Sequence, residues 1–283
     1  ILGLFLLENI SRKKAQYHST TKGGFKKKSL TTLHGYKAIF AFSFCFLIFF
    51  ISFLFPVIQM LYWTIIFPKH LIDLDLISLF SNTIILVLFS SFVLISFAFI
   101  SNYGNRLSKS KFLEILTTFS ISGYAMPGII LAVAFITFIS WFDNNIVAYF
   151  KLETIKSIFI GSIIGLVVVY FIRFYSLASN GIKSGYLKIS YSIDESAYLL
   201  GYSKFKTFKD IHIPYLKNSI LLIGILIAIE IIKELPITLI MRPFNFETFA
   251  TQAYIYASQD LLEAAAAPSL FLILIASFFI LIT

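Results

Sequence analysis

Residues 84–100 read IILVLFSSFVLISFAFI, an apolar stretch without a single charged side chain. A helix that crosses the hydrocarbon core of a bilayer needs about 20 predominantly apolar residues. Five more stretches of the same kind lie at residues 38–67, 116–141, 158–172, 220–240 and 264–281. In lipid, a helix satisfies its own backbone hydrogen bonds, whereas irregular backbone does not. The pattern therefore predicts an all-α membrane helical bundle with six transmembrane helices.

The composition agrees with a membrane protein. Of the 283 residues, 58% are hydrophobic and 13% are charged, whereas a soluble domain carries about 25% charged residues. Polar side chains are too few to cover a folded surface in water, and a lipid surround removes that requirement. The single cysteine, Cys45, excludes an intramolecular disulfide bond and a multi-cysteine metal cluster.

The basic residues predict an orientation. If the chain crosses the membrane six times, 18 of the 23 Lys and Arg residues fall on the side of residues 8–37. Four fall on the opposite side, and Lys233 lies within the fifth apolar stretch. Lys and Arg concentrate in cytoplasmic loops, so the side of residues 8–37 is predicted to be cytoplasmic. This distribution explains the net charge of +9 without nucleic acid.

The first residues predict a connection to another membrane segment. Residues 1–7 (ILGLFLL) are apolar up to the first position and are expected to be the end of a preceding transmembrane helix. Residues 8–37 are polar and rich in Gly and Lys, which indicates a basic cytoplasmic linker. Residues 38–283 then form the transmembrane domain, and the chain is expected to be a piece of a longer one.

The longest internal cytoplasmic loop contains a predicted short helix. Ser192 and Glu195 have the spacing of a capping box, in which each side chain satisfies a free amide at a helix start. Asp194 adds favourable charge near the same N-terminus. Gly201 is expected to end the helix in the left-handed conformation. One apolar face is predicted from Ile193, Ala197 and Leu200.

A second short helix is predicted directly afterwards. Ser203 is expected to cap it, Phe205 and Phe208 share one face, and Pro214 is expected to end it. Two capped helices joined at a glycine suit insertion into a groove on a soluble partner. An amphipathic hairpin that rests on the bilayer surface explains the same pattern.

The composite motif in residues 190–214 resembles a known one. Glu195-Ser-Ala197, three residues, Gly201, nine residues and Ile211-His-Ile-Pro214 resemble the EAA loop of binding-protein-dependent permeases of ABC importers. That pattern is Glu-Ala-Ala, three residues, Gly, nine residues, Ile-x-Leu-Pro. The spacing is kept, and the two departures are mild: Ser196 and Ile213.

The resemblance implies the ABC importer permease fold, with residues 38–283 as the permease domain and 190–214 as its cytoplasmic coupling loop. In that family this loop docks on the ATPase subunits, and the contact is carried over to Glu195, Ala197 and Gly201. A periplasmic binding protein on the other side and a location in the bacterial inner membrane are implied too. A second permease half or subunit would complete the pore.

Asn82-Thr83 is expected to open the second span, as a similar Asn-Ser/Thr pair does in the same family. Three other stretches resemble the ferric-iron branch of these permeases: Gly123-Tyr-Ala-Met-Pro127-Gly128, Lys233-Glu-Leu-Pro236 and Arg242-Pro-Phe-Asn-Phe-Glu247. That branch commonly fuses two six-helix halves in one chain, so the resemblance implies the second half of such a protein, with ferric iron as cargo. Thiamine or polyamine remains an alternative cargo, and an ATPase-independent secondary transporter is the alternative from another class.

Three charged residues lie in or near the fifth apolar stretch: Glu230, Lys233 and Glu234. Charges are costly in a bilayer, so they are expected to face the bundle interior and to pair. They either line the translocation path or form a structural ion pair. Pro236 is expected to kink or end this helix, and Pro127 with Gly128 to kink the third one.

The sequence contains no GxxxxGK[ST] motif, so ATP must be bound by partner ATPase subunits and this chain is not itself an enzyme. The four histidines are scattered, most are expected to be solvated, and no spacing indicates a metal site or a cofactor.

Overall fold

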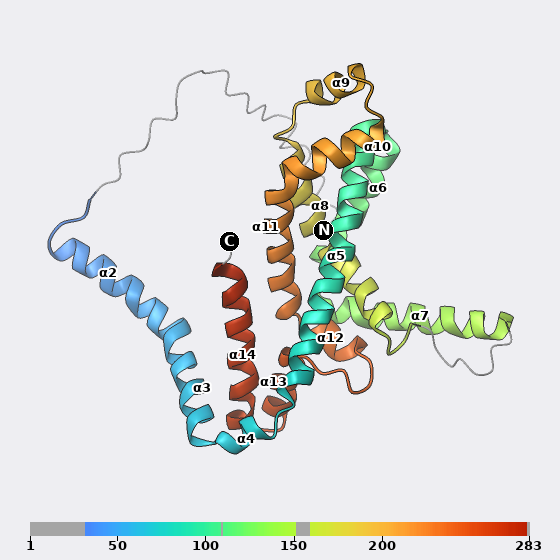
Figure 1. Ribbon diagram of the computed structural model, residues 1–283. Helices are drawn as coiled ribbons and strands as arrows, with labels where there is room; N and C mark the ends of the chain where they lie inside the picture. The colour runs from blue at the N-terminus through green and yellow to red at the C-terminus, as the bar shows by residue number, and fades with distance from the viewer. Residues whose placement is uncertain (1–31, 109, 151–158, 282–283) are drawn as a thin grey trace. The chain divides into compact units, whose positions relative to one another are not determined.

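The computed structural model describes residues 32–108, 110–150 and 159–281 (Figure 1). Residues 1–7 and almost all of the linker at 8–37 lie outside the described residues, so both remain predictions. The chain forms two compact units, residues 1–58 and 59–283. The described residues are mostly helical and include no strand.

The described part of the first unit is one apolar helical stretch. It consists of α2 (Tyr36–Phe49), a π-helical segment η1 (Phe50–Leu54) and the beginning of α3 (Phe55–Ile66). None of these elements contains a buried residue, and phenylalanine rings stack along its surface, as at Phe42 and Phe46. The stretch Tyr36–Ile66 matches the first predicted span and is long and apolar enough to cross a membrane.

The second unit contains the remaining helices. After α3 the order is α4 (Pro68–Ile72), α5 (Leu76–Ser108), α6 (Lys111–Ile121), the 3-10 segment η2 (Ser122–Ala125), α7 (Gly128–Phe150), α8 (Ile163–Tyr186), α9 (Tyr191–Leu199), α10 (Lys204–Thr207), the π-helical segment η3 (Phe208–His212), α11 (Ile213–Ile232), α12 (Pro236–Met241), α13 (Phe249–Ser258) and α14 (Leu262–Leu281).

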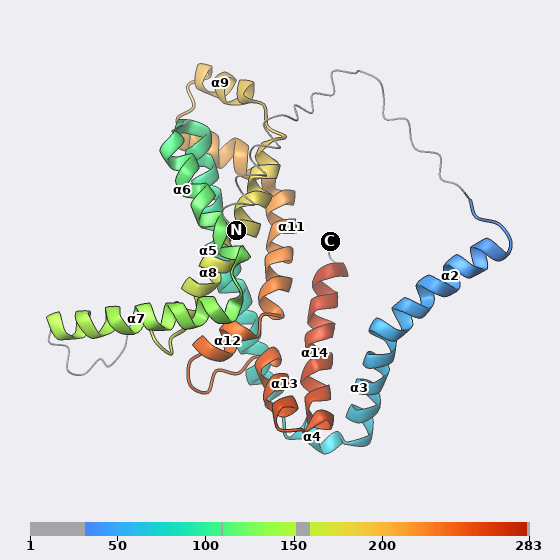
Figure 2. The same cartoon turned by 180° about the vertical axis from the view of Figure 1, so that it is seen from behind.

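Helices α5, α8 and α11 form the centre of this unit and lie side by side (Figures 1 and 2). The main core cluster includes Leu86 and Leu94 of α5, Tyr170 and Phe174 of α8, and Ile227 of α11. Close approach of α8 and α11 depends on glycines. A Cβ at Gly181 would lie 2.6 Å from Ile223, and one at Gly185 would lie 2.8 Å from Leu216. Small residues at helix contacts are typical of membrane bundles.

The predicted spans are found with one important difference. Among the described residues, five helices are long and apolar enough to cross a membrane: Tyr36–Ile66, Leu76–Ser108, Ile163–Tyr186, Lys204–Ile232 and Leu262–Leu281. A sixth candidate is the pair Lys111–Ala125 and Gly128–Phe142, which is bent by 116°. The kink expected at Pro127 and Gly128 is therefore a break between two helices.

Several predicted boundaries are wrong by more than a turn, and those of the fourth and second spans bear on the site. The fourth span was placed at residues 158–172, but α8 covers Ile163–Tyr186, so Arg173 lies inside a helix instead of in a loop. The second span was expected to open at Asn82, but α5 begins at Leu76. In both cases polar side chains within the helix find partners on neighbouring elements, which hydropathy does not register.

Candidate functional site

Helix α9 has its N-cap two residues before the predicted one. Its N-cap is Ser190, whose hydroxyl accepts a hydrogen bond from the Ser192 amide at 3.3 Å. Ser192 is the second residue of the helix, and its hydroxyl bonds to that of Ser190 at 2.7 Å. The predicted capping box of Ser192 and Glu195 is therefore wrong, because Ser190 already satisfies the helix start. Glu195 is left exposed.

The corner after α9 is the one expected. Gly201 has a φ of +82°. Its amide donates to the Tyr198 carbonyl at 3.0 Å, and the Tyr202 amide donates to the Ala197 carbonyl at 3.0 Å. This pair of hydrogen bonds is a Schellman motif. The predicted left-handed glycine is confirmed, and so is Ser203 as the next cap, since its hydroxyl accepts from the Lys206 amide at 3.2 Å.

The second short helix does not end at Pro214. Residues Lys204–Ile232 form one helical stretch, in which η3 leads from α10 into α11. Pro214 is the second residue of α11. A proline ring clashes with the carbonyl four residues earlier in a regular helix, and here that position, Asp210, lies in the wider π-helical turn of η3. The π-helical turn thus lets the chain continue through Pro214.

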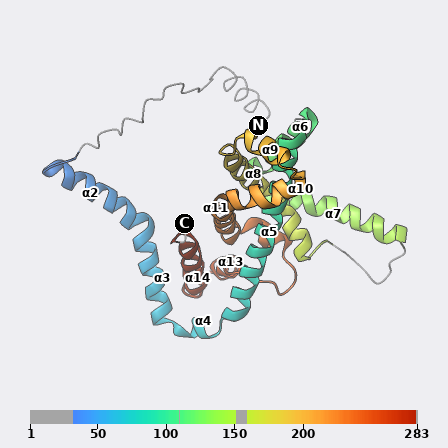
Figure 3. The same ribbon diagram turned by 45° about the horizontal axis from the view of Figure 1, so that its top comes forward.

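The exposed end of this region is apolar. Leu199, Leu200 and Phe205, here named the α9–α10 tip, are all exposed. Leu200 was predicted to share one apolar face with Ile193 and Ala197, but it is exposed while Ala197 is buried. Phe205 was predicted to share a face with Phe208, but Phe205 is exposed while Phe208 is half-buried. The inward face of α9 instead contains Asp194 and Ala197, which are buried. Figure 3 shows α9 and α10 at the same end of the second unit as α6.

The five motif residues of the predicted coupling loop differ from one another in exposure. Glu195, Gly201 and Pro214 are exposed, and Ile211 is half-buried. Ala197 is buried against the bundle, so its side chain is not available to a partner.

A buried ionic cluster holds α9 against the bundle. Arg106, near the end of α5, donates from Nε to Asp194 Oδ2 at 2.6 Å. Its Nη1 and Nη2 donate to the carbonyls of Ile189 and Ser190, each at 3.0 Å. The second carboxylate oxygen of Asp194 lies 2.8 Å from His212 Nε2. We name Arg106, Asp194 and His212 the Arg106 cluster.

The cluster is enclosed by aromatic rings. The side chains of Arg106, Asp194 and His212 are 6%, 9% and 0% exposed. The Tyr103 and Tyr186 ring centroids lie 5.2 Å and 5.4 Å from that of His212. Most of the four histidines were expected to be solvated, and His212 is not one of those, because it is fully buried. The only signal in the sequence was its position inside the motif Ile211-His-Ile-Pro214.

The charged residues near the end of α11 separate into two pairs. Lys233 Nζ lies 2.6 Å from Glu230 Oε1, the expected pair three residues apart. Glu234 is buried and pairs with Arg173 of α8, whose Nε lies 3.4 Å from Glu234 Oε2. We name Arg173 and Glu234 the Arg173 pair. Lys233 was expected to face the interior, but its side chain is 56% exposed within this chain.

The Arg173 pair lies where two helical segments break. Arg173 Nη1 donates to the Met126 carbonyl at 2.5 Å, just before α7 begins. Glu234 Oε1 accepts from the Ile237 amide at 3.4 Å, at the start of α12. A Cβ added to Gly128 would lie 2.8 Å from Glu234 Oε1, so the start of α7 also touches this carboxylate. Pro236 begins α12, which confirms that α11 ends before it.

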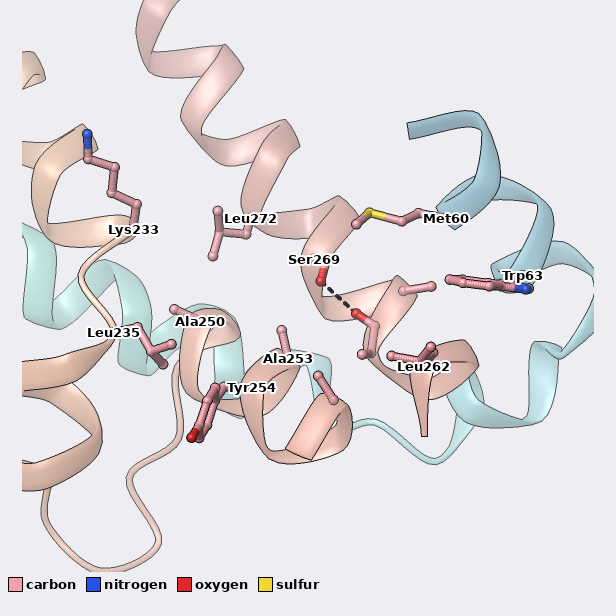
Figure 4. A pocket seen from close by; sticks show the side chains of 13 residues that line it. Met60, Trp63, Lys233, Leu235, Ala250, Ala253, Tyr254, Leu262, Ser269 and Leu272 are labelled. Atoms are coloured by element: carbon pink, nitrogen blue, oxygen red, sulfur yellow. Dashed lines mark hydrogen bonds between the residues drawn. The ribbon is translucent and has the colours of Figure 1, made fainter. Parts of the chain in front are cut away.

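Lys233 borders an apolar cavity of about 400 Å³. Figure 4 shows Lys233 and Leu235 on one side of it, and Met60 and Trp63 on the other. Most of its lining residues belong to α13 and α14, and five of them are alanines: Ala250, Ala253, Ala257, Ala265 and Ala266.

The loop before α13 is tied to α5. Arg242 forms an ion pair with Glu247, and Asn82 Nδ2 donates to the Glu247 carbonyl at 3.0 Å. Thr83 Oγ1 accepts from the Phe249 amide at 3.3 Å. The stretches Asn82-Thr83 and Arg242–Glu247, which were singled out separately in the sequence, therefore lie next to each other. Among the described residues, no group of three or more His, Cys, Asp or Glu side chains could hold a metal ion.

The chain is similar in sequence to a curated transport permease. The chain is 22% identical over 265 residues to the Fe(3+)-transport system permease protein FbpB 2 of Haemophilus influenzae. The match covers 93% of this chain and 50% of that protein, so the chain spans about half the length of the curated relative it matches. No protein-family model matches the chain.

Two solved structures are similar over most of the chain. One is the bacterial alginate ABC transporter in complex with alginate pentasaccharide-bound periplasmic protein. It has a TM-score of 0.69 at 16% identity over 87% of this chain and 92% of that chain. The other is a bacterial ABC transporter involved in the import of the acidic polysaccharide alginate. Its TM-score is 0.65 at 17% identity over 87% and 93% of the two chains. The predicted all-α ABC importer permease fold and the resemblance to such permeases are confirmed.

Proposed function

We propose that this chain is the membrane-spanning permease subunit of an ATP-driven, binding-protein-dependent ABC importer. The observation that supports this most directly is the α9–α10 tip. Three large apolar side chains are exposed there, Leu199 and Leu200 at the end of α9 and Phe205 in α10, and α9 is itself held in place by buried contacts. A rigid apolar projection suits a groove on another protein, because little conformational entropy is lost when it docks.

In this proposal the tip docks on partner ATPase subunits, which bind and hydrolyse ATP. Glu195 and Gly201 are exposed beside the tip and are proposed to contact the ATPase directly. Ala197 is buried, so its small side chain lets α9 pack closely on the bundle. Ile211 and Pro214 belong to the start of the long helix that carries the tip into the membrane.

The proposed mechanism is alternating access. ATP-driven closure of the ATPase subunits moves α9, and the bundle rocks between inward-open and outward-open states around a central path. A periplasmic binding protein delivers its cargo to the outward-open state. The chain is proposed to reside in the bacterial inner membrane as a multi-pass protein, with α9 and α10 at the cytoplasmic face because basic residues concentrate on that side.

We further propose that Glu230, Lys233 and Glu234 border the translocation path. Lys233 borders the apolar cavity and remains more than half exposed within this chain. A lysine so exposed beside apolar walls is expected to face a water-filled space or a second permease half, because lipid would exclude its charge. Residues 1–7 and 8–37 are then proposed to connect a preceding half, with residues 38–283 as the second half of a fused chain.

Ferric iron is the proposed cargo. The support is the similarity to the Fe(3+)-transport permease over 93% of this chain. The solved structures of similar fold come from alginate transporters, which favours a different cargo, and thiamine or polyamine remains an alternative. We expect the binding protein to select the cargo.

The test is the ATPase activity of the full-length complex in liposomes, with purified binding protein added either empty or loaded with ferric ion. Stimulation by the ferric-loaded form alone supports both the permease function and iron. Stimulation by another loaded binding protein retains the permease and removes iron. Uptake without any associated ATPase would replace the proposal with a secondary transporter.

A further inference from the structure

The Arg106 cluster joins three separate elements at a single carboxylate. Arg106 is near the end of α5, Asp194 is in the first turn of α9, and His212 ends the π-helical turn that begins the α11 helix. Both oxygens of Asp194 are used, one by Arg106 at 2.6 Å and one by His212 at 2.8 Å. A movement of α9 therefore acts directly on α5 and α11.

Apart from its caps at Ser190 and Gly201, helix α9 has few contacts that keep it helical. It contains nine residues, and an isolated helix shorter than about 12–15 residues is marginal in water. Its buried positions are Asp194 and Ala197. Arg106 also holds the chain just before α9 through the carbonyls of Ile189 and Ser190. The cluster thus fixes both the start of the helix and its inward face.

We infer that Arg106, Asp194 and His212 are positioning residues that transmit movement of α9 to α5 and α11. The inference rests on the proposed function, because it assumes that an ATPase subunit moves α9. None of the three side chains is exposed to such a partner, so their part is to link the docked helix to the membrane helices. Without the link, α9 would still present the apolar tip but would no longer move the bundle.

The test uses the full-length chain assembled with its ATPase subunits in nanodiscs, and compares Asp194→Asn and Asp194→Ala with Asp210→Asn. Asp210 is a suitable control because it is an exposed acidic residue two positions from His212. Amide hydrogen exchange is measured in α5, α9 and α11, with and without trapping by ATP and vanadate. In the untrapped complex, α9 amides should exchange at least about tenfold faster in Asp194→Ala, with an intermediate change in Asp194→Asn.

Trapping distinguishes transmission from simple structural support. In the wild type and in Asp210→Asn, vanadate trapping should change exchange in α9, α5 and α11 together. In Asp194→Asn, it should change exchange in α9 while α5 and α11 no longer respond. A merely structural role would lower the amount of assembled complex and leave the responses of the three helices coupled.

Two results would overturn the inference. One is unchanged α9 exchange in Asp194→Ala, and the other is an equal response of α5 and α11 to trapping in Asp194→Asn and Asp210→Asn. Failure of the proposed function has a different signature, because trapping would then change none of the three helices in the wild type.

Discussion

Two arginines, Arg106 and Arg173, each pair with an acidic side chain far along the chain, yet their surroundings differ. Arg106 donates to its carboxylate at 2.6 Å and to two carbonyls at 3.0 Å, and its side chain is 6% exposed. Arg173 lies 3.4 Å from its carboxylate, and its side chain is 21% exposed. Only the first arginine is fully enclosed and closely bonded to its carboxylate.

The difference indicates how the two regions are built. The Arg106 cluster connects the short helix α9 to the long helices α5 and α11. Both carboxylate oxygens of Asp194 have a close partner. The Arg173 pair lies between the ends of broken segments, where Met126 and Ile237 supply backbone partners at 2.5 Å and 3.4 Å. A longer, partly exposed ion pair between breaks is easier to separate than a short, enclosed one.

The largest predicted effect is that of Arg106→Ala. The change leaves Asp194 buried without its main counter-charge, and breaking a buried ion pair costs about 3–5 kcal/mol. We expect a corresponding loss in the free energy of unfolding, measured by denaturant titration in detergent. Lys183→Ala, at an exposed lysine near the end of α8, should change it by less than about 0.5 kcal/mol. Equal effects of the two changes would contradict this view of the cluster.

Arg173→Ala should have a smaller effect. Glu234 keeps the Ile237 amide as a partner, and the ion pair that is lost is long and partly exposed. We expect a loss of about 1–3 kcal/mol in the same titration. Arg173→Lys keeps the charge and should recover part of this loss. A loss in the free energy of unfolding as large as that of Arg106→Ala would show that the two ion pairs contribute equally to stability.

Much of the fold could be predicted from hydropathy, because a membrane helix is defined by a continuous local property. The caps at Gly201 and Ser203 were predictable for the same reason, since each depends on neighbouring residues only. Ser190 was missed because the spacing of Ser192 and Glu195 matches a better-known pattern. Pro214 was misread because a π-helical turn has no simple sequence signature.

The partners of Arg106 and Arg173 could not be predicted, in contrast to the local pair of Glu230 and Lys233. Arg106 and Asp194 are 88 positions apart, and their contact exists only once α5 and α9 lie next to each other. Arg173 was assigned to a loop, and it is 61 positions from Glu234. The spacing of neighbouring residues therefore could not indicate that the two form a pair. Such contacts depend on tertiary packing, which cannot be read from the local pattern of a single sequence.

Gly123→Ala tests the helix break on which the Arg173 pair depends. A Cβ at Gly123 would lie 2.1 Å from the Ile172 carbonyl oxygen, so backbone must shift. We expect a loss of about 1–3 kcal/mol in thermal or denaturant unfolding. Gly104→Ala is the matched control, because no atom lies within 4 Å of the added carbon, and in a helix it should gain up to about 1 kcal/mol. If Gly123→Ala left the free energy of unfolding unchanged, the backbone at this helix break would be able to shift without cost.

Gly201→Val should cost less in stability but more in function. The residue has a φ of +82°, with no atom within 4 Å of an added Cβ, so the penalty is backbone strain of about 1–2 kcal/mol. The strain should misdirect the α9–α10 tip and weaken ATPase binding, measured by co-purification, while membrane insertion is unchanged. Gly201→Asn tolerates this conformation better and should retain most of the binding. Normal transport by Gly201→Val would remove the docking assignment.

The smallest effect on stability is predicted for Lys233→Met. The ion pair with Glu230 is partly exposed, and surface pairs contribute about 0–1 kcal/mol, so the free energy of unfolding should scarcely change. Transport should nevertheless change if Lys233 borders the path, because the substitution removes a positive charge beside the cavity. A matched Glu230→Gln variant removes the other charge of the pair. If both variants lose stability together and keep transport, the pair is structural, and the region near the end of α11 is then fixed in the same sense as the Arg106 cluster.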